Sequence, residues 1–119
     1  MNRRHTISFM HALEGIGYAI RTQPNFVIHL LISLVVIAVG WWLQITGAEW
    51  LLVAVVIAFG LVIEMLNTSI EAVVDLVTDE IKPLAKIAKD CASGAMLVYA
   101  LGASVVGLLI FLPKLWLFF

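Results

Sequence analysis

The sequence predicts an all-α membrane protein: a helical bundle of three transmembrane helices preceded by an amphipathic surface helix. The 119 residues are 63% hydrophobic and only 13% charged, whereas soluble domains are about half apolar and a quarter charged. Mean hydropathy is +1.09, and long apolar runs alternate with short polar ones. The length suits a single integral-membrane domain over residues 1–119. Three helices bury too little surface to enclose a site, so we expect the chain to form oligomers.

Charge and cysteine content exclude several classes of protein. The net charge is −1, with no basic cluster or aromatic stacking motif, so no nucleic-acid partner is expected. The single cysteine, Cys91, cannot form an internal disulfide, which agrees with a reducing or membrane-buried setting. A signal peptide is not expected, because the first long apolar run begins only near Phe26 and no small-x-small cleavage pattern follows it.

Residues 5–22 are predicted to form the surface helix, lying in the membrane interface or against the bundle. Polar side chains occupy one arc of this helix, and the opposite arc is an apolar stripe. The stripe consists of Phe9, Leu13, Ile16 and Ile20. We expect residues 22–25 to break the helix, because Pro24 disfavours helical geometry at Gln23.

The first two spans are predicted at about 26–43 and 48–77. The first is long enough to cross a bilayer and ends in Trp41 and Trp42, which suit the far membrane interface. Residues 50–63 are apolar but too few to cross alone. The second helix is therefore expected to continue to the end of its range, roughly 28 residues and about 42 Å.

The third span is predicted at about 84–112, after a polar loop over residues 78–83. Pro83 suits the first turn of this helix, and Pro113 is expected to lie just beyond its end. Small residues spaced by four would let neighbouring helices approach closely: Ala100 with Ser104, and Ala103 with Gly107.

Lysine and arginine predict the orientation of the chain. Six lie in the N-terminal segment and around the second loop: Arg3, Arg4, Arg21, Lys82, Lys86 and Lys89. On the opposite side there is only Lys114. By the positive-inside rule, the N-terminus and second loop are cytoplasmic and the C-terminus lies outside.

The second predicted span carries a stripe of four polar residues: Glu64, Asn67, Glu71 and Asp75. On a helix they fall within an arc of roughly 80°. An ionisable group at hydrocarbon depth costs several kcal/mol unless it is paired or lines a wet site, so this stripe is the expected functional site.

The third predicted span carries a second polar face beyond the short loop: Lys86, Lys89, Asp90 and Ser93. Together the two faces offer carboxylates for a divalent cation, lysines for phosphate, and a carboxylate deep enough to meet a lipid headgroup. These are the groups that phosphoryl transfer requires. No Walker A sequence, kinase glycine loop, HExxH or Cys/His metal pattern is present.

Other interpretations of these residues remain open. Glu64 alone could form a structural interhelical hydrogen bond, Asn67 could join helices, and Lys86 could serve only as an orientation signal. A small oligomeric channel or proton-coupled transporter could use Glu64 as a carboxylate relay. The polar groups stop in the cytoplasmic half of the predicted bundle, which favours an enzyme acting on a headgroup.

Two motifs together resemble a known family. They read Glu64-x-x-Asn67-x-x-x-Glu71-Ala-Val-Val-Asp75 and Leu84-Ala-Lys-Ile-Ala-Lys89-Asp90. The chain is similar to the small bacterial integral-membrane lipid kinases, the diacylglycerol kinase and undecaprenol kinase family. The second motif looks closer to the undecaprenol kinase type. The resemblance implies a multi-pass protein of the bacterial inner membrane, a homotrimer with active sites shared between subunits, and phosphorylation of a lipid alcohol by ATP with Mg²⁺.

The resemblance also implies roles for the stripe. Glu64 would contact the lipid hydroxyl and act as its general base, and Ser93 would lie near the lipid headgroup. Glu71 would bind the Mg²⁺ of ATP, with Asn67 and Asp75 supporting the nucleotide site. The tail of the lipid meets an undifferentiated apolar surface, so diacylglycerol and undecaprenol both remain open as substrates.

Further residues are assigned to the nucleotide by the same resemblance. Lys89 and Asp90 would contact it directly, and Glu80 matches an acidic position near it. Arg4 and His11 match nucleotide-binding positions in the N-terminal region.

The chain departs from the family pattern at two positions. Gln23 stands where the family usually has a glutamate that is the second metal ligand, and Lys82 replaces a frequent histidine. A glutamine offers only a neutral carbonyl oxygen, so weaker Mg²⁺ binding is expected.

Overall fold

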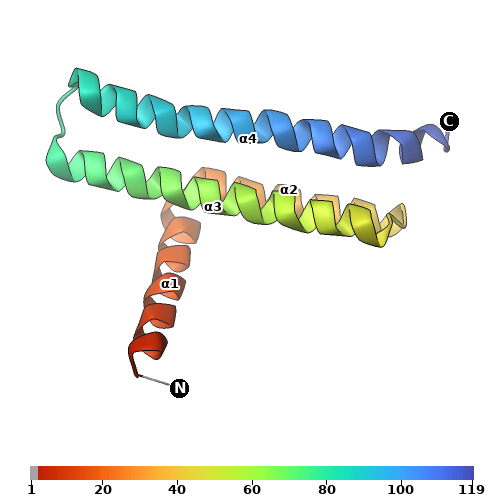
Figure 1. Cartoon of the computed structure of the whole chain (residues 1–119), viewed down its shortest axis with the longest axis horizontal. Helices are drawn as coiled ribbons and strands as arrows, with labels where there is room; N and C mark the ends of the chain where they lie inside the picture. Colours follow the sequence, from red (N-terminus) through yellow and green to blue (C-terminus); the bar gives the residue numbers. More distant parts are fainter. Residues whose placement is uncertain (1–2) are drawn as a thin grey trace.

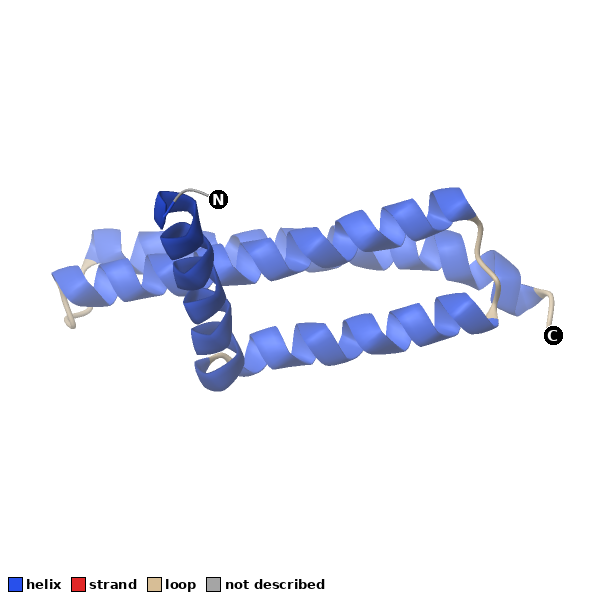
Figure 2. Ribbon diagram, turned by 90° about the horizontal axis from the view of Figure 1, so that it is seen from below, coloured by secondary structure: helices blue, strands red, loops and turns tan. Residues whose placement is uncertain are grey.

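The structure, a computed structural model, describes residues 3–119 and consists there of four helices and short connections. In chain order the helices are α1 (Arg3–Thr22), α2 (Pro24–Trp42), α3 (Gly47–Val77) and α4 (Pro83–Trp116). The last three run along one axis, whereas α1 crosses them at a steep angle (Figures 1 and 2). Each of α2, α3 and α4 is long and apolar enough to span a membrane. The prediction of an all-helical chain with three apolar spans is confirmed.

The break between α1 and α2 is shorter than the expected 22–25. Only Gln23 leaves the helical conformation, with φ −112° and ψ 99°, and Pro24 opens α2. A proline fits the first turn of a helix because the amide hydrogen it lacks has no helical partner there. This single extended residue redirects the chain, so that α1 runs across the bundle instead of continuing α2 (Figure 2).

The long helix α3 begins at a capping box. The Thr46 hydroxyl accepts a hydrogen bond from the Glu49 backbone amide, and the Glu49 carboxylate accepts one from the Thr46 amide. These bonds satisfy two backbone groups that would otherwise lack partners at the helix start. The helix then continues without a break to Val77, as the length argument predicted, and so carries the polar stripe on a single rigid element.

The prediction that the last helix ends before Pro113 is wrong. The helix runs through Pro113 to Trp116. A proline inside a helix removes one backbone hydrogen bond and crowds the preceding turn, so its presence requires compensation from neighbouring contacts.

Contacts at this end of the bundle provide that compensation. Lys114 Nζ lies 3.2 Å from Glu49 Oε2, and both side chains are about one-quarter exposed. The rings of Trp42 and Phe118 stack with their centroids 5.4 Å apart. These contacts join the ends of α2, α3 and α4, and they hold the last turn of α4 in place.

The helices of one chain bury few side chains. α3 contacts each of the other helices, and a small apolar cluster joins the loop after α2 to α3 and α4 through Ile45, Val53 and Ile110. Most other large apolar side chains are exposed, as expected for a chain whose outer surface faces lipid or further subunits.

A close approach between α3 and α4 occurs at Gly60. The Tyr99 side chain lies directly over this glycine, where any Cβ atom would overlap the phenol ring. The Tyr99 hydroxyl donates a hydrogen bond to the Val56 carbonyl oxygen over 2.8 Å. Gly60 and Tyr99 together therefore fix the spacing and register of the two helices.

Candidate functional site

Glu64 is the most unusual side chain of the polar stripe. It is 1% exposed and is the one polar or charged residue that is buried within residues 3–119. Its Oε2 atom is buried and has no hydrogen-bond partner. Buried polar atoms in proteins are nearly always paired, and each exception needs an explanation. Glu64 is therefore prepared to accept a hydrogen bond from a group that the isolated chain does not supply.

Asn67 lies one turn further along the same face of α3. Its Oδ1 atom is also buried without a partner. By contrast, the hydroxyl of the neighbouring Thr68 donates to the Glu64 carbonyl oxygen over 2.9 Å and is satisfied within the helix. Within residues 3–119, the buried side-chain atoms without a partner therefore both belong to the predicted polar stripe.

Glu71 connects this buried part of the stripe to its exposed end. The Glu71 side chain is half-buried. Along α3 it lies seven positions after Glu64 and four before Asp75. The structure brings the α3 stripe and the α4 face together at its exposed end, where Lys89 contacts Asp75.

The ends of α3 and α4 form a pocket of about 200 Å³ around the loop that joins them. Its charged lining is made of four carboxylates and two lysines: Asp75, Asp79, Glu80, Asp90, Lys86 and Lys89. This part of the hairpin projects beyond the junction of α1 and α2 (Figure 1). The pocket lies about 16 Å along α3 from Glu64, since eleven residues separate Glu64 from Asp75.

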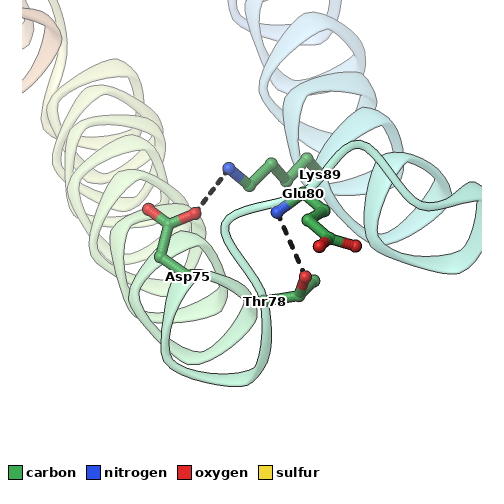
Figure 3. Close-up of polar contacts among 4 residues, drawn as sticks. All are labelled: Asp75, Thr78, Glu80 and Lys89. Carbon is green, nitrogen blue, oxygen red and sulfur yellow. Dashed lines mark hydrogen bonds and ion pairs between the residues drawn. The ribbon is translucent and has the colours of Figure 1, made fainter.

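An ion pair spans the pocket from one helix to the other. Lys89 Nζ on α4 donates to Asp75 Oδ1 on α3 over 2.7 Å (Figure 3). The second lysine, Lys86, pairs instead with Asp90 one turn along its own helix. Lys89 is therefore the pocket lysine that is held from the opposite helix.

The loop itself is ordered by local hydrogen bonds. The Thr78 hydroxyl accepts from the Glu80 amide over 3.1 Å (Figure 3), and the Glu80 carboxylate lies 3.7 Å from Lys82 Nζ. Glu80 is exposed at the rim of the pocket, where the resemblance expects an acidic side chain near the nucleotide.

No hydrogen bond or ion pair within residues 3–119 joins the other predicted site residues to the stripe or the pocket. Arg4 and His11 are exposed on α1, and His11 pairs with Glu14 over 3.1 Å. The Gln23 amide nitrogen donates to the Thr22 hydroxyl over 3.2 Å. Ser93 is exposed on α4. Residues 3–119 contain no group of three His, Cys, Asp or Glu side chains arranged to hold a metal ion.

A second cavity, of about 250 Å³, lies among the apolar parts of α2, α3 and α4. His29 and Tyr99 line one end, and Ile110 and Phe111 line it further along α4. The His29 and Tyr99 rings lie 5.8 Å apart. On α3 the lining ends at Ile57, about two turns before Glu64, so the cavity belongs to the apolar part of the bundle.

Sequence reasoning did not assign His29 or Tyr99 to the site. A lone histidine near a membrane surface is more often a structural residue, and Tyr99 stands in an apolar run. The feature that could have identified Tyr99 involves two residues, an aromatic side chain on α4 opposite a glycine on α3. This pairing can be recognised only when the register of the two helices is known.

Comparisons with known proteins agree with the resemblance. The family model described as prokaryotic diacylglycerol kinase matches residues 10–111. The undecaprenol kinase of Bacillus subtilis (strain 168) is 44% identical over 108 residues, covering 91% of this chain and 88% of that protein. A Synechocystis diacylglycerol kinase is 41% identical, covering 92% of this chain and 63% of the longer relative. A Pseudomonas aeruginosa diacylglycerol kinase is 38% identical, covering 74% of this chain and 72% of that protein.

Proposed function

This chain belongs to the prokaryotic diacylglycerol kinase family and is a lipid kinase, and we propose that it transfers the γ-phosphate of ATP to a lipid alcohol at the cytoplasmic face of the bacterial inner membrane. Family membership favours this function over the channel or transporter alternative. The single observation that supports the reaction best is the buried Glu64 carboxylate with its unpartnered oxygen.

Glu64 acts as the general base in this proposal. The lipid hydroxyl donates its hydrogen bond to the free Glu64 oxygen, and its own oxygen attacks the γ-phosphorus. A new P–O bond forms while the bond to the β–γ bridging oxygen breaks, so that ADP leaves and the hydroxyl proton passes to Glu64. Little other covalent help is required, because phosphoryl transfer depends mainly on alignment and charge stabilisation.

In this proposal the lipid hydroxyl and the lipid tail have separate sites. Its hydroxyl meets Glu64, with Ser93 near the headgroup, and its apolar tail follows the cavity among α2, α3 and α4. Both diacylglycerol, which gives phosphatidic acid, and undecaprenol, which gives undecaprenyl phosphate, carry a hydroxyl and an apolar tail.

The nucleotide occupies the pocket between α3 and α4. Lys89 and Asp90 contact it, Glu80 lies at its rim, and Asn67 and Asp75 support the site. The pocket lining carries four carboxylates against two lysines, so a polyphosphate needs an accompanying cation to approach it. Glu71 lies on α3 between Glu64 and Asp75, and in this proposal its carboxylate faces the phosphates.

Mg²⁺ fits this site as an ion delivered with the phosphates. It usually keeps several waters and takes only one or two protein carboxylates, so a prebuilt group of three ligands is not required. Glu71 would hold it, with Gln23 as a second, neutral ligand. When bound, the ion neutralises the phosphate oxygens during transfer.

Oligomerisation completes the proposed site. Arg4 and His11 lie on α1, away from the α3–α4 pocket of their own chain (Figure 1). A homotrimer would let the α1 of one subunit reach the nucleotide of the next. From the cluster of lysine and arginine we infer that the N-terminus and the α3–α4 loop lie in the cytoplasm, where ATP is available, and the C-terminus outside.

The reaction is tested by incubating the purified protein in mixed micelles with γ-labelled ATP and Mg²⁺. Diacylglycerol and undecaprenol are supplied separately, and transfer of label to at least one lipid is the expected result. A wild-type protein that is inactive on every lipid alcohol contradicts the proposal.

The magnesium dependence provides a separate prediction. Gln23→Glu should lower the Mg²⁺ concentration needed for half-maximal activity, because a carboxylate binds a hard cation more strongly than an amide oxygen does. Gln44→Glu makes the same chemical change in the loop at the opposite end of the bundle, and should leave the dependence unchanged. If the Mg²⁺ titration of Gln23→Glu matches the wild type, Gln23 is not a metal ligand.

A further inference from the structure

Asp75 stands where helix electrostatics disfavours it. It lies in the last turn of α3, and no basic residue of α3 lies there to offset the negative end of the helix dipole. The positive charge beside it comes from Lys89, 14 positions along the chain and on the other helix. The ion pair is largely exposed, with the Asp75 and Lys89 side chains 62% and 43% accessible. Water screens such pairs, so this one adds little to stability.

The ion pair determines where the Lys89 side chain points. A lysine side chain has four rotatable bonds and is otherwise free to extend into water. In the structure it reaches across the space between the two helices, and its ammonium group stops at Asp75 (Figure 3). An ammonium group has three donors, and this bond to Asp75 uses one of them. Within residues 3–119 no other side chain accepts from this ammonium group, and Lys89 lines the pocket.

We propose that Asp75 is a positioning residue that holds the Lys89 ammonium group over the pocket for the phosphates, and that it binds neither nucleotide nor metal itself. The inference rests on the proposed function, since it takes the pocket to be the nucleotide site. It goes beyond general support for the site, because it assigns Asp75 an action through one named partner.

Two possible roles of Asp75, a contribution to the negative charge of the pocket and the positioning of Lys89, predict opposite results for Asp75→Asn. If only the field of the pocket mattered, removing one of four carboxylates would strengthen the binding of an anionic nucleotide. If Asp75 positions Lys89, the same change releases the lysine. Activity then falls by about 10- to 100-fold through misalignment, with a raised KM for ATP or a lowered kcat.

A double-mutant cycle separates positioning from direct contact. Lys89→Met removes the positive charge that the proposal places beside the phosphates, and should reduce activity by about 100- to 1,000-fold. Adding Asp75→Asn to Lys89→Met should then cause no further loss beyond about twofold, because its only partner is already gone. Full additivity of the two losses, or a shifted Mg²⁺ dependence in Asp75→Asn alone, overturns the proposal.

The chain offers a matched control at the other end of the same helix pair. Glu49 on α3 pairs with Lys114 on α4, and this ion pair is less exposed than that of Asp75. Glu49→Gln should therefore affect α3–α4 packing at least as much as Asp75→Asn does, and a glutamine preserves the capping box. Activity near the wild-type level in Glu49→Gln, with a clear loss in Asp75→Asn, is expected. Equal losses in both variants would mean a merely structural role.

Failure of the kinase reaction is distinguishable from failure of this inference. If no lipid alcohol is phosphorylated, binding of Mg·ATP is measured by equilibrium dialysis on the same variants. Weaker binding in Asp75→Asn, with no additional weakening in the Lys89→Met background, still supports positioning. Unchanged or tighter binding in Asp75→Asn overturns it.

Discussion

Replacing Glu64 by glutamine is expected to reduce lipid phosphorylation by about 100- to 10,000-fold, the usual contribution of a general base. The change keeps the shape of the side chain but removes its ability to take the hydroxyl proton. Folding should not suffer, since the variant removes a buried carboxylate whose Oε2 atom has no partner in the chain. The measurement is transfer of labelled γ-phosphate, combined with thermal unfolding of the same preparations in micelles.

Glu49→Gln again provides the matched control for this prediction. It makes the same carboxylate-to-amide change on the same helix, but at the ion pair with Lys114 near the opposite end of the helix. Its activity should stay close to that of the wild type. A Glu64→Gln variant with near-normal phosphorylation, or with a loss explained entirely by unfolding, would assign Glu64 a structural role between helices.

Adding one methyl group at Gly60 should have the largest effect on folding. The new Cβ would overlap the Tyr99 ring, and forcing extra volume into a packed contact costs about 1–3 kcal/mol. If α4 moves to relieve the overlap, the Tyr99 bond to the Val56 carbonyl is lost and the register of α3 against α4 changes. Gly60→Ala should therefore lower both the thermal unfolding midpoint and phosphorylation.

Two comparisons make the Gly60 prediction specific. A Cβ at Gly102 on α4 would meet no atom within 4 Å, so Gly102→Ala should be neutral or stabilising through higher helix propensity. In a Tyr99→Ala background, Gly60→Ala should cost little, because the overlapping ring is gone. Equal destabilisation by Gly60→Ala in both backgrounds would show that the ring contact is not the cause.

The polar stripe was predictable because it is local. Residues three or four apart on one helix share a face whatever the rest of the fold does, so Glu64, Asn67, Glu71 and Asp75 could be grouped without a structure. Hydropathy likewise predicted three spans, since a run of apolar residues must be long enough to cross a bilayer. The length of α3 through Val77 followed from the same reasoning.

Helix ends were less predictable. The sequence placed a four-residue break around Pro24 and an end before Pro113, whereas the structure has one extended residue, Gln23, and a helix that passes through Pro113. A proline weakens a helix locally, but whether the helix stops depends on contacts further away. The ion pair of Lys114 with Glu49 is such a contact.

The sequence by itself determined that this chain is helical, apolar on most faces and polar on one stripe, because those properties depend on composition and short spacings. Only the tertiary structure decided that Glu64 is buried with an unpaired oxygen, and that Lys89 reaches from α4 to Asp75. The physical reason is the register of α3 against α4, to which the close contact of Tyr99 over Gly60 and the ion pairs near both ends of the two helices contribute. Which residues meet across those helices depends on that alignment, and no local spacing encodes it.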